Sequence, residues 1–313
     1  MITSIPTAED FRSTGIALIN LAWESVITVA QNLAGAPVEN WGDENDAETI
    51  ATWKAALDGY LQSAQQALAT AVALAQQGTE FLLKSKIAAV SPFLLISSSP
   101  GDWPKGCEKA DTPFADFKTI DAQDLPRAHD CVCSPRLSEE FRSKFDQLRR
   151  LRNTVMHTVD RRARFTVQDG VLAILEVVEA LVAPQGWVAI RRSHLQSTPA
   201  LSPDRENPWD CLLAREITCV VGLLQPAEVR RFFGFNKRTR RYRCPGCDLG
   251  CADWAIGADL AVLEPNTPES TSVVCFLCGE TYEVERRACT REECPGNVIS
   301  TEWDTCLTCG LSG

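Results

Sequence analysis

Two sets of four cysteines stand in the last part of the chain, and their spacing restricts its fold more than any other feature of the sequence. The first set consists of two CxxC pairs, Cys244–Cys247 and Cys275–Cys278. A CxxC turn directs two thiolates at one ion, and two such turns complete a closed tetrahedral site for a structural zinc ion. Because so short a segment buries little apolar area, we expect zinc to help it fold.

The second set has a wider first pair and is predicted to bind a second structural zinc ion. Its members are Cys289, Cys294, Cys306 and Cys309. Cys251 competes as a ligand of the first set, but packing or a free thiol is the simpler interpretation. The two sets look like zinc ribbons, and closed four-sulfur sites of this kind predict no catalytic metal.

The remaining cysteines do not indicate a disulfide framework. A third candidate metal site is irregularly spaced and loop-like, so ordinary thiols are the simpler interpretation: Cys107, His129, Cys131 and Cys133. Cys211 and Cys219 stand in an apolar stretch and are expected in a core. The first residues lack the basic start and apolar run of a signal peptide, which favours metal binding over disulfides among the 14 cysteines.

Charge and hydropathy exclude two broad classes of protein. The longest apolar stretches are interrupted well before the ~20 residues that a membrane span needs. We therefore expect a cytoplasmic protein without a membrane segment. The net charge of −10 argues against a general nucleic-acid coat. It leaves room for a local basic groove, because salt screens charges beyond roughly 10 Å.

The first two thirds of the chain predict helices. Residues 8–34 form an apolar-periodic stretch, and a second helix follows, with apolar residues at helical spacing: Ile50, Trp53, Leu57, Leu61, Ala64, Leu68 and Val72. Gly78 interrupts it, residues 96–136 predict a long loop, and 139–158 a further helix. Thr166 with Asp169 predicts a helix start. Residues 184–208 suggest a linker, and 210–235 another helix.

The helix over 139–158 carries the strongest candidate for acid–base chemistry, the run Arg152-Asn153-Thr154-Val155-Met156-His157. Imidazole titrates near neutrality, and a guanidinium can hold a phosphate by two hydrogen bonds. At 100° per residue, Arg150, Asn153 and His157 share one stripe with Asp146, whereas Arg152 projects from the apolar side, about 140° from His157. An arginine there needs a partner, and Glu80 is the candidate.

One phosphate would not easily reach both Arg152 and His157 of one straight helix. Three resolutions stay open: the helix is distorted, two subunits share the site, or Arg150 binds the phosphate. The plainest alternative is a structural histidine beside a solvated basic face.

The run resembles the motif of the HEPN superfamily (higher eukaryotes and prokaryotes nucleotide-binding), in which Arg and a polar residue precede His by a fixed interval. Gln76–Lys84 looks like the acidic, Leu-rich helix that commonly precedes that motif. The resemblance covers roughly residues 45–185 and implies an antiparallel helical bundle. One departure is that Thr158-Val159 follows the histidine, where some catalytic members carry Tyr two residues on.

The resemblance implies a metal-independent endoribonuclease that works as a homodimer with two motifs across one cleft. His157 would be the acid or base, Arg152 would stabilise the phosphorane, and Asn153 would bind phosphate or orient His157. Such domains recur in toxin and antiviral defence systems, which implies a growth-arresting role and a protein activator or antitoxin as partner. Many HEPN domains are inactive, and the alternative is a non-catalytic adaptor that binds protein or nucleic acid.

A basic stretch precedes the cysteines and contains no acidic residue between positions 230 and 243. Its candidate RNA-binding residues are Arg238, Arg240, Arg241 and Arg243, and aromatic residues interleave with the charges: Phe232, Phe233, Phe235 and Tyr242. Charge for phosphates and rings for bases suit RNA, whereas the alternative is a solvated linker with packed rings.

The sequence thus predicts a mainly α protein in four parts. Residues 1–44 form a helix on the bundle, 45–185 a HEPN-like helical domain, 186–240 a helical extension with the basic stretch, and 241–313 a β-rich zinc-ribbon domain.

Overall fold

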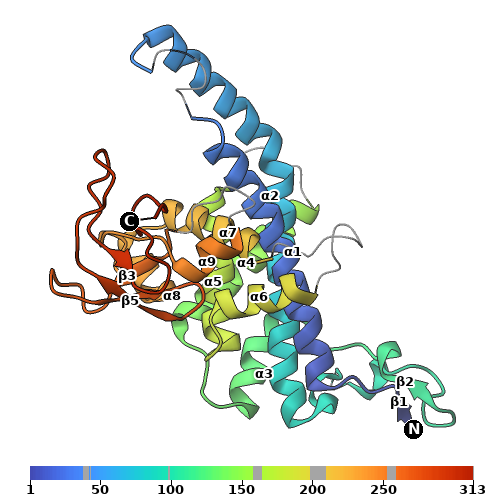
Figure 1. The fold of residues 1–313 in the computed structure, drawn as a ribbon. Helices are drawn as coiled ribbons and strands as arrows, with labels where there is room; N and C mark the ends of the chain where they lie inside the picture. Colours follow the sequence, from blue (N-terminus) through green and yellow to red (C-terminus); the bar gives the residue numbers. More distant parts are fainter. Residues whose placement is uncertain are drawn as a thin grey trace, which may run out of the picture. The chain divides into compact units, whose positions relative to one another are not determined.

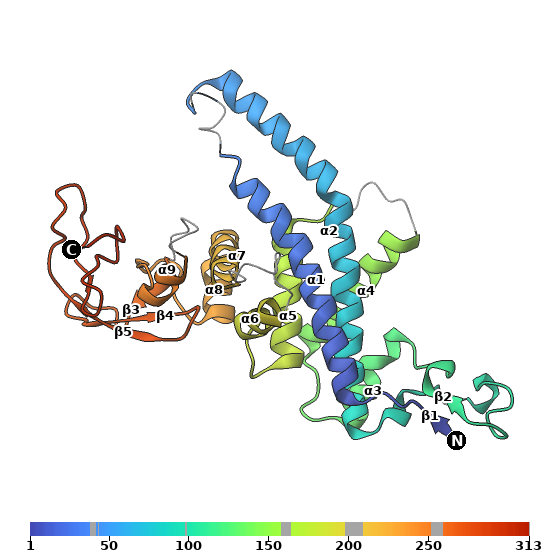
Figure 2. The same ribbon diagram turned by 45° about the vertical axis from the view of Figure 1, so that its right-hand side comes forward.

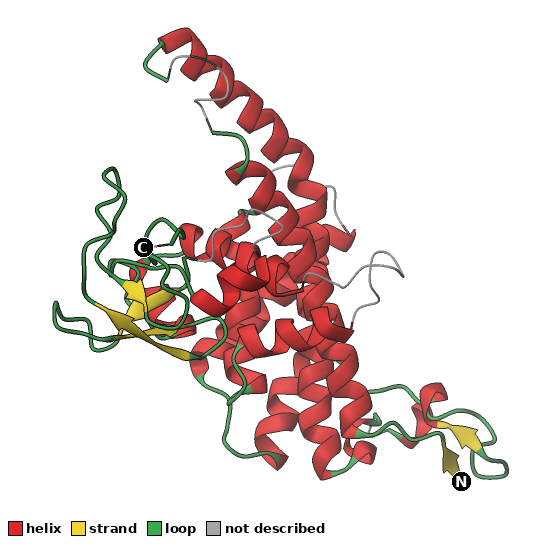
Figure 3. Ribbon diagram, in the orientation of Figure 1, coloured by secondary structure: helices red, strands yellow, loops and turns green. Residues whose placement is uncertain are grey.

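The computed structural model describes residues 1–37, 42, 44–97, 99–157, 164–197, 209–251 and 259–312, apart from the side chains of 155–157, 249 and 250. It is mainly helical with a small antiparallel sheet near the C-terminus, as predicted (Figure 3). The chain forms two compact units, Met1–Gln185 and Gly186–Gly313. Each unit is described by itself.

The first unit is built on a long antiparallel pair of helices, α1 (Ala8–Ala34) and α2 (Ala47–Val90), visible in Figures 1 and 2. Helices α4 (Glu139–His157) and α5 (Val167–Val182) pack on this pair, and α3 (Leu125–Val132) packs on α2. The core between them is apolar and includes Trp23, Leu83, Phe145 and Ile174.

Side chains at the helix starts explain where these helices begin. The Thr7 hydroxyl accepts a hydrogen bond from the Asp10 N–H while the Asp10 carboxylate accepts one from the Thr7 N–H, which caps α1 at both groups. Thr166 accepts from the Asp169 N–H at 3.1 Å and starts α5, as the sequence predicts. The apolar face of α4 is also confirmed, since its phenylalanines at 141 and 145 are buried.

The predicted interruption at Gly78 is wrong, because α2 continues unbroken through it. A Cβ at this position would lie 2.9 Å from Ile19 Cδ1 and 3.0 Å from the carbonyl oxygen of Gly15. The glycine therefore allows α1 and α2 to approach closely rather than ending the helix.

The segment over 96–136 is mostly irregular, as predicted, but it contains α3. A turn of 3-10 helix precedes the region at Pro92–Leu95, and three more lie within it, at Pro100–Asp102, Phe114–Asp116 and Ala122–Asp124. Strand β2 (Thr112–Pro113) pairs in parallel with β1 (Ile2–Thr3), so the loop ties back to the N-terminus.

The second unit combines four described helices with the small sheet. The helices are α6 (Trp187–Ser197), α7 (Trp209–Leu223), α8 (Pro226–Phe233) and α9 (Pro245–Cys251). The strands pair antiparallel in the order β3 (Ala261–Leu263), β4 (Ser272–Cys275), β5 (Thr281–Glu285) and β6 (Ile299–Ser300). Helix α6 replaces part of the expected linker, and α9 adds a helix where only turns were expected.

Residues 186–240 belong to the same compact unit as the cysteine sets, whereas the sequence suggested a boundary near residue 240. The contacts explain the difference. The Phe235 ring stacks on Phe276 with centroids 3.9 Å apart, and Tyr242 exchanges backbone hydrogen bonds with Ala261. These contacts join the helical extension to the sheet.

One described helix, α1, has the length and composition of a membrane span, with a mean hydropathy of 1.3 over its most apolar window. Half of that window is buried within the first unit, which is also the pattern of a core helix.

Candidate functional sites

The first cysteine set gathers in the structure as predicted. The sulfur atoms of Cys244, Cys247, Cys275 and Cys278 all lie within 4.8 Å of one another. The Cys244–Cys278 distance is 3.7 Å and the Cys247–Cys275 distance is 3.9 Å. Four thiolates about 2.3 Å from a tetrahedral zinc ion would stand about 3.8 Å apart. The set fits such an ion, and the separations are far longer than a disulfide bond.

The second set gathers in the same way. Cys289 and Cys309 lie 3.9 Å apart, and so do Cys294 and Cys306, all within the same 4.8 Å limit. The wide spacing of its first pair does not prevent closure, because the Cys289 N–H donates to the Gly296 carbonyl and folds the intervening residues into a turn. Both sets can therefore hold metal ions, consistent with structural zinc.

The second pair of each set has the same local sequence, Cys-x-x-Cys-Gly. Gly279 and Gly310 have φ of 79° and 76°, in the left-handed region that favours glycine. Their N–H groups donate to the carbonyls of Cys275 and Cys306, at 2.9 and 2.7 Å. Glycine after the second cysteine was a signal in the sequence that would have strengthened the prediction of both sites.

The sulfur atoms of each set differ in how readily they ionise. Burial opposes ionisation of Cys306, but the N–H groups of Cys309 and Thr308 hydrogen-bond to its sulfur and lower its pKa to about 7. In the first set, neighbouring sulfur atoms raise the pKa of Cys247 and lower that of Cys278. Four thiolates repel one another unless a cation offsets their charge.

Cys251 lies outside the first set, as the simpler interpretation had it. Its thiol is buried, and its pKa is raised by that burial first and then by the adjacent Cys211 thiol of α7. The third candidate site is not assembled, because the described residues contain no ligand group other than the two cysteine sets. The irregular spacing of those cysteines explains this result.

The Arg-Asn-His motif lies at the C-terminal end of α4. Arg152 and Asn153 are both half-buried, and the Arg152 guanidinium donates to the Asn153 side-chain oxygen at 3.2 Å. Arg150, two residues before Arg152, is exposed. His157 is the last residue of the helix, and its side chain lies outside the described part of the structure. The side chains of Arg152 and Asn153 thus contact each other in the last turns of α4, and both are half-buried.

Glu80 does not act as the partner of Arg152 that the sequence suggested. Its carboxylate accepts from the Gln76 side chain one turn earlier at 3.2 Å, and its charge opposes the lowering of the Lys84 pKa by burial. Among the described side chains, no ion pair joins Glu80 to Arg152. Glu80 instead contacts a residue one turn away on its own helix, as helical spacing favours.

The basic stretch is only partly free for a ligand. Arg238 and Arg240 are exposed, although Arg240 donates to the Thr308 hydroxyl and lies over the Tyr242 ring. Arg241 is half-buried, and Arg243 pairs with Asp248 at 3.2 Å. Two of the four predicted RNA-binding arginines therefore face solvent.

The aromatic residues of this stretch do not all remain available to stack on bases. Phe235 and Tyr242 are buried in the packing of the second unit. A half-exposed ring that the sequence analysis missed is Trp303, which lines a hollow of about 200 Å³ together with Arg243 and Asp248. Its distance in sequence from the basic stretch concealed it.

The comparisons with known proteins leave the family undetermined. No family model, no curated protein and no solved structure matches the chain. The structure defines its class by its own parts: a mainly helical protein with a small C-terminal antiparallel sheet and two four-cysteine groups that can hold metal ions.

Proposed function

We propose that the chain is a metal-independent endoribonuclease of the HEPN type, with Arg152, Asn153 and His157 as its catalytic residues. One observation carries the proposal. The Arg152 guanidinium lies half-exposed beside the Asn153 amide, and no carboxylate among the described residues neutralises it. A cation held by a neutral amide keeps its charge for a phosphate.

The motif supplies the groups that RNA transesterification requires. His157 takes the proton of a ribose 2′-hydroxyl, whose oxygen attacks the adjacent phosphorus, or returns a proton to the departing 5′-oxygen. Arg152 stabilises the charge of the phosphorane, and Asn153 orients the phosphate or the imidazole. Bond making and breaking then balance in a 2′,3′-cyclic phosphate and a free 5′-hydroxyl, with no metal in the step.

The remaining parts of the proposal concern assembly and recruitment. A homodimer would place two motifs across one cleft. Arg152 of one subunit could then meet His157 of the other, although the two residues point in different directions on one helix. The second unit, braced by two zinc ions, would recruit RNA through Arg238, Arg240 and Trp303 or sense a trigger. A growth-arresting role in toxin or antiviral defence, with a protein activator or antitoxin, extends the same proposal.

The decisive experiment incubates purified full-length protein with labelled RNA in excess EDTA. We expect cleavage that ends in cyclic phosphates, that His157→Ala lowers by at least about 10²-fold, and that His194→Ala leaves unchanged. His194 is the matched control because it lies on α6, outside the motif. Cleavage retained in His157→Ala would overturn the assignment.

A second arm decides which arginine binds the phosphate. Arg152→Ala should abolish cleavage while Arg150→Ala retains it, and the reverse result would move the phosphate contact to Arg150. Mixing inactive Arg152→Ala with inactive His157→Ala restores part of the activity only if two subunits share a site. If neither the wild type nor any variant cuts RNA, and none slows growth when its expression is induced, the chain is better explained as a non-catalytic adaptor.

A further inference from the structure

A pocket of about 490 Å³ opens in the first unit, away from the motif end of α4. It lies between the end of α2, the helix α3, the start of α4 and the end of α5. Its wall is largely apolar, with Val90, Val132, Phe141 and Leu181 among the lining residues. Pockets of this size and composition suit small organic ligands.

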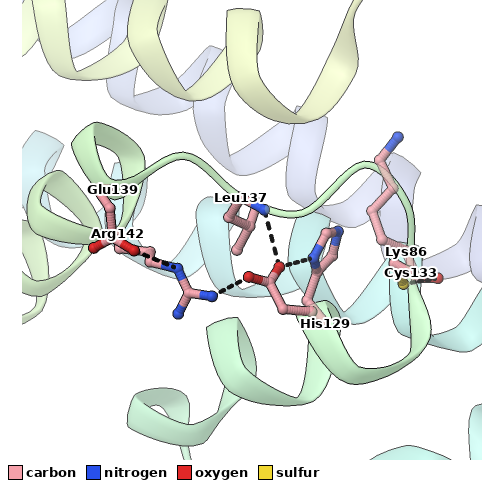
Figure 4. A network of polar contacts seen from close by, with 7 residues as sticks. Lys86, His129, Cys133, Leu137, Glu139 and Arg142 are labelled. Carbon is pink, nitrogen blue, oxygen red and sulfur yellow. Dashed lines mark hydrogen bonds and ion pairs between the residues drawn. The ribbon is translucent and has the colours of Figure 1, made fainter.

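His129 is buried in the wall of this pocket and is fixed by a carboxylate. Only 4% of the residue is exposed, and its Nδ1 lies 2.8 Å from Asp130 Oδ1. Figure 4 shows the other ring nitrogen pointing away from these contacts. No described residue hydrogen-bonds to that nitrogen, Nε2. A carboxylate that holds one nitrogen of a histidine orients the other toward a ligand.

The charge of Asp130 is already offset by its neighbours. Its carboxylate accepts hydrogen bonds from the Leu137 N–H at 2.9 Å and from the Arg142 guanidinium (Figure 4). Burial raises the pKa of Asp130, but these hydrogen bonds, that of His129 and the charge of Arg142 outweigh it and lower the pKa overall. Asp130 is therefore ionised and paired, and it does not make the pocket anionic.

The charges that line the pocket are positive. Lys86 from α2 and Arg136 from the loop before α4 line the pocket, and none of its lining residues carries a carboxylate. The start of α4 adds the positive end of a 19-residue helix, since Leu137 and Ser138 also line the pocket. An anionic group at the mouth would meet two cations and a fixed imidazole.

A thiol reaction at this site is disfavoured. The Cys133 thiol donates to the Lys86 carbonyl at 3.4 Å, and burial first, with Asp130 adding to it, raises its pKa despite the charge of Lys86. It is a poor nucleophile in that state. The geometry favours binding over covalent chemistry.

We propose that this pocket binds a small organic anion, with a phosphate or carboxylate held by His129 Nε2 and Lys86 and an apolar body against the Val90, Phe141 and Leu181 wall. His129 Nε2 contacts the charged group of the ligand while Nδ1 keeps its contact with Asp130. The site is separate from the RNA-cleaving motif, so its test does not depend on ribonuclease activity.

The test is calorimetric titration of the full-length protein with three probes of one shape. These are 1-naphthyl phosphate, 1-naphthoate and the neutral 1-naphthol. We expect one site per chain that binds at least one of the anions more tightly than the neutral probe. The stronger anion identifies the ligand's charged group as phosphate or carboxylate. Equal affinity for all three, or no binding of either anion at millimolar concentration, would overturn the proposal.

Variants separate a ligand-binding histidine from one that only braces the loop. His129→Asn keeps a donor near Asp130 but removes Nε2, and should lower affinity about tenfold or more. His194→Asn is its control. Lys86→Gln should lower affinity about threefold, whereas Lys54→Gln, exposed on the same helix, should not. Because Lys86 is exposed, its variant remains informative even if His129→Asn unfolds. Unchanged affinity in Lys86→Gln and in folded His129→Asn would exclude the assigned contacts.

Discussion

The two units of the chain differ in what holds them together. The first unit buries a continuous apolar core along helices of 8 to 44 residues, with Trp23 fully enclosed. The cysteine-rich half of the second unit has strands of two to five residues, and its buried side chains include cysteines of both sets beside apolar residues such as Val273 and Ile299. Packing stabilises the first region, whereas metal ions held by the two cysteine sets would contribute to the stability of the second.

The same contrast extends to the candidate functional groups. Cys244, Cys275 and Cys306 are fully buried and suit a structural role, while Arg152 and Asn153 lie half-exposed at a helix end. Closed four-sulfur sites leave no open position for a substrate. The proposed function accordingly assigns the chemistry to the first unit and a structural role to the cysteine sets of the second.

The largest expected effect comes from removing the metal. Cys275→Ser, or a strong chelator, should abolish protection of residues 259–312 in hydrogen exchange of the full-length protein, because structural zinc contributes about 10–16 kcal/mol in small zinc domains. Mass spectrometry of the native wild type should find two zinc ions per chain. Protection within residues 8–34 should remain.

Cys131→Ser is the matched control, since Cys131 is exposed and outside both sets. If Cys275→Ser kept native protection and full zinc content, the contrast between the units would fail.

A smaller effect tests the packing of the first unit. Gly78→Ala should lower the free energy of unfolding by about 1–3 kcal/mol, because its Cβ would press on Ile19 and the Gly15 carbonyl. At Gly59 on the same helix, no atom lies within 4 Å of the methyl group that alanine would add. Gly59→Ala should therefore raise the free energy of unfolding by about 0.5–1 kcal/mol. Chemical denaturation measures both, and equal signs would contradict the close helix approach.

The smallest effect concerns pH. The pKa of Asp130 is lowered in the folded state, so its carboxylate stabilises the fold above the unfolded-state pKa of about 3.9. This stabilisation is lost as the pH falls through the folded-state pKa. Asp130→Asn should cost about 1 kcal/mol near neutrality and progressively less toward pH 3. Hydrogen bonds also lower the pKa of Asp10 and Asp46, so the stability of both the wild type and the variant keeps some dependence on pH.

Asp121→Asn, at an exposed carboxylate, serves as the comparison. A constant difference between Asp130→Asn and wild type from pH 7 to pH 3 would show that the carboxylate does not stabilise the fold through its charge.

Much of this arrangement could be predicted from the sequence because it rests on local periodicity. The helix over 8–34 and the start of α5 at Thr166 follow from spacing within one or two turns, and the membership of both cysteine sets follows from the paired spacing of metal ligands. The unbroken α2 could not be predicted, because a glycine inside a helical pattern does not reveal whether another helix crosses it.

The sequence thus determined which residues form helices, through local periodicity, and which cysteines act together, through their pairwise spacing. Only the tertiary structure decided where the units divide, which arginines of the basic stretch face solvent, and that His129 stands in a pocket wall. Those features depend on contacts between residues far apart in the sequence, such as Phe235 with Phe276 and Asp130 with Arg142. Such contacts arise from three-dimensional packing, which no local pattern encodes.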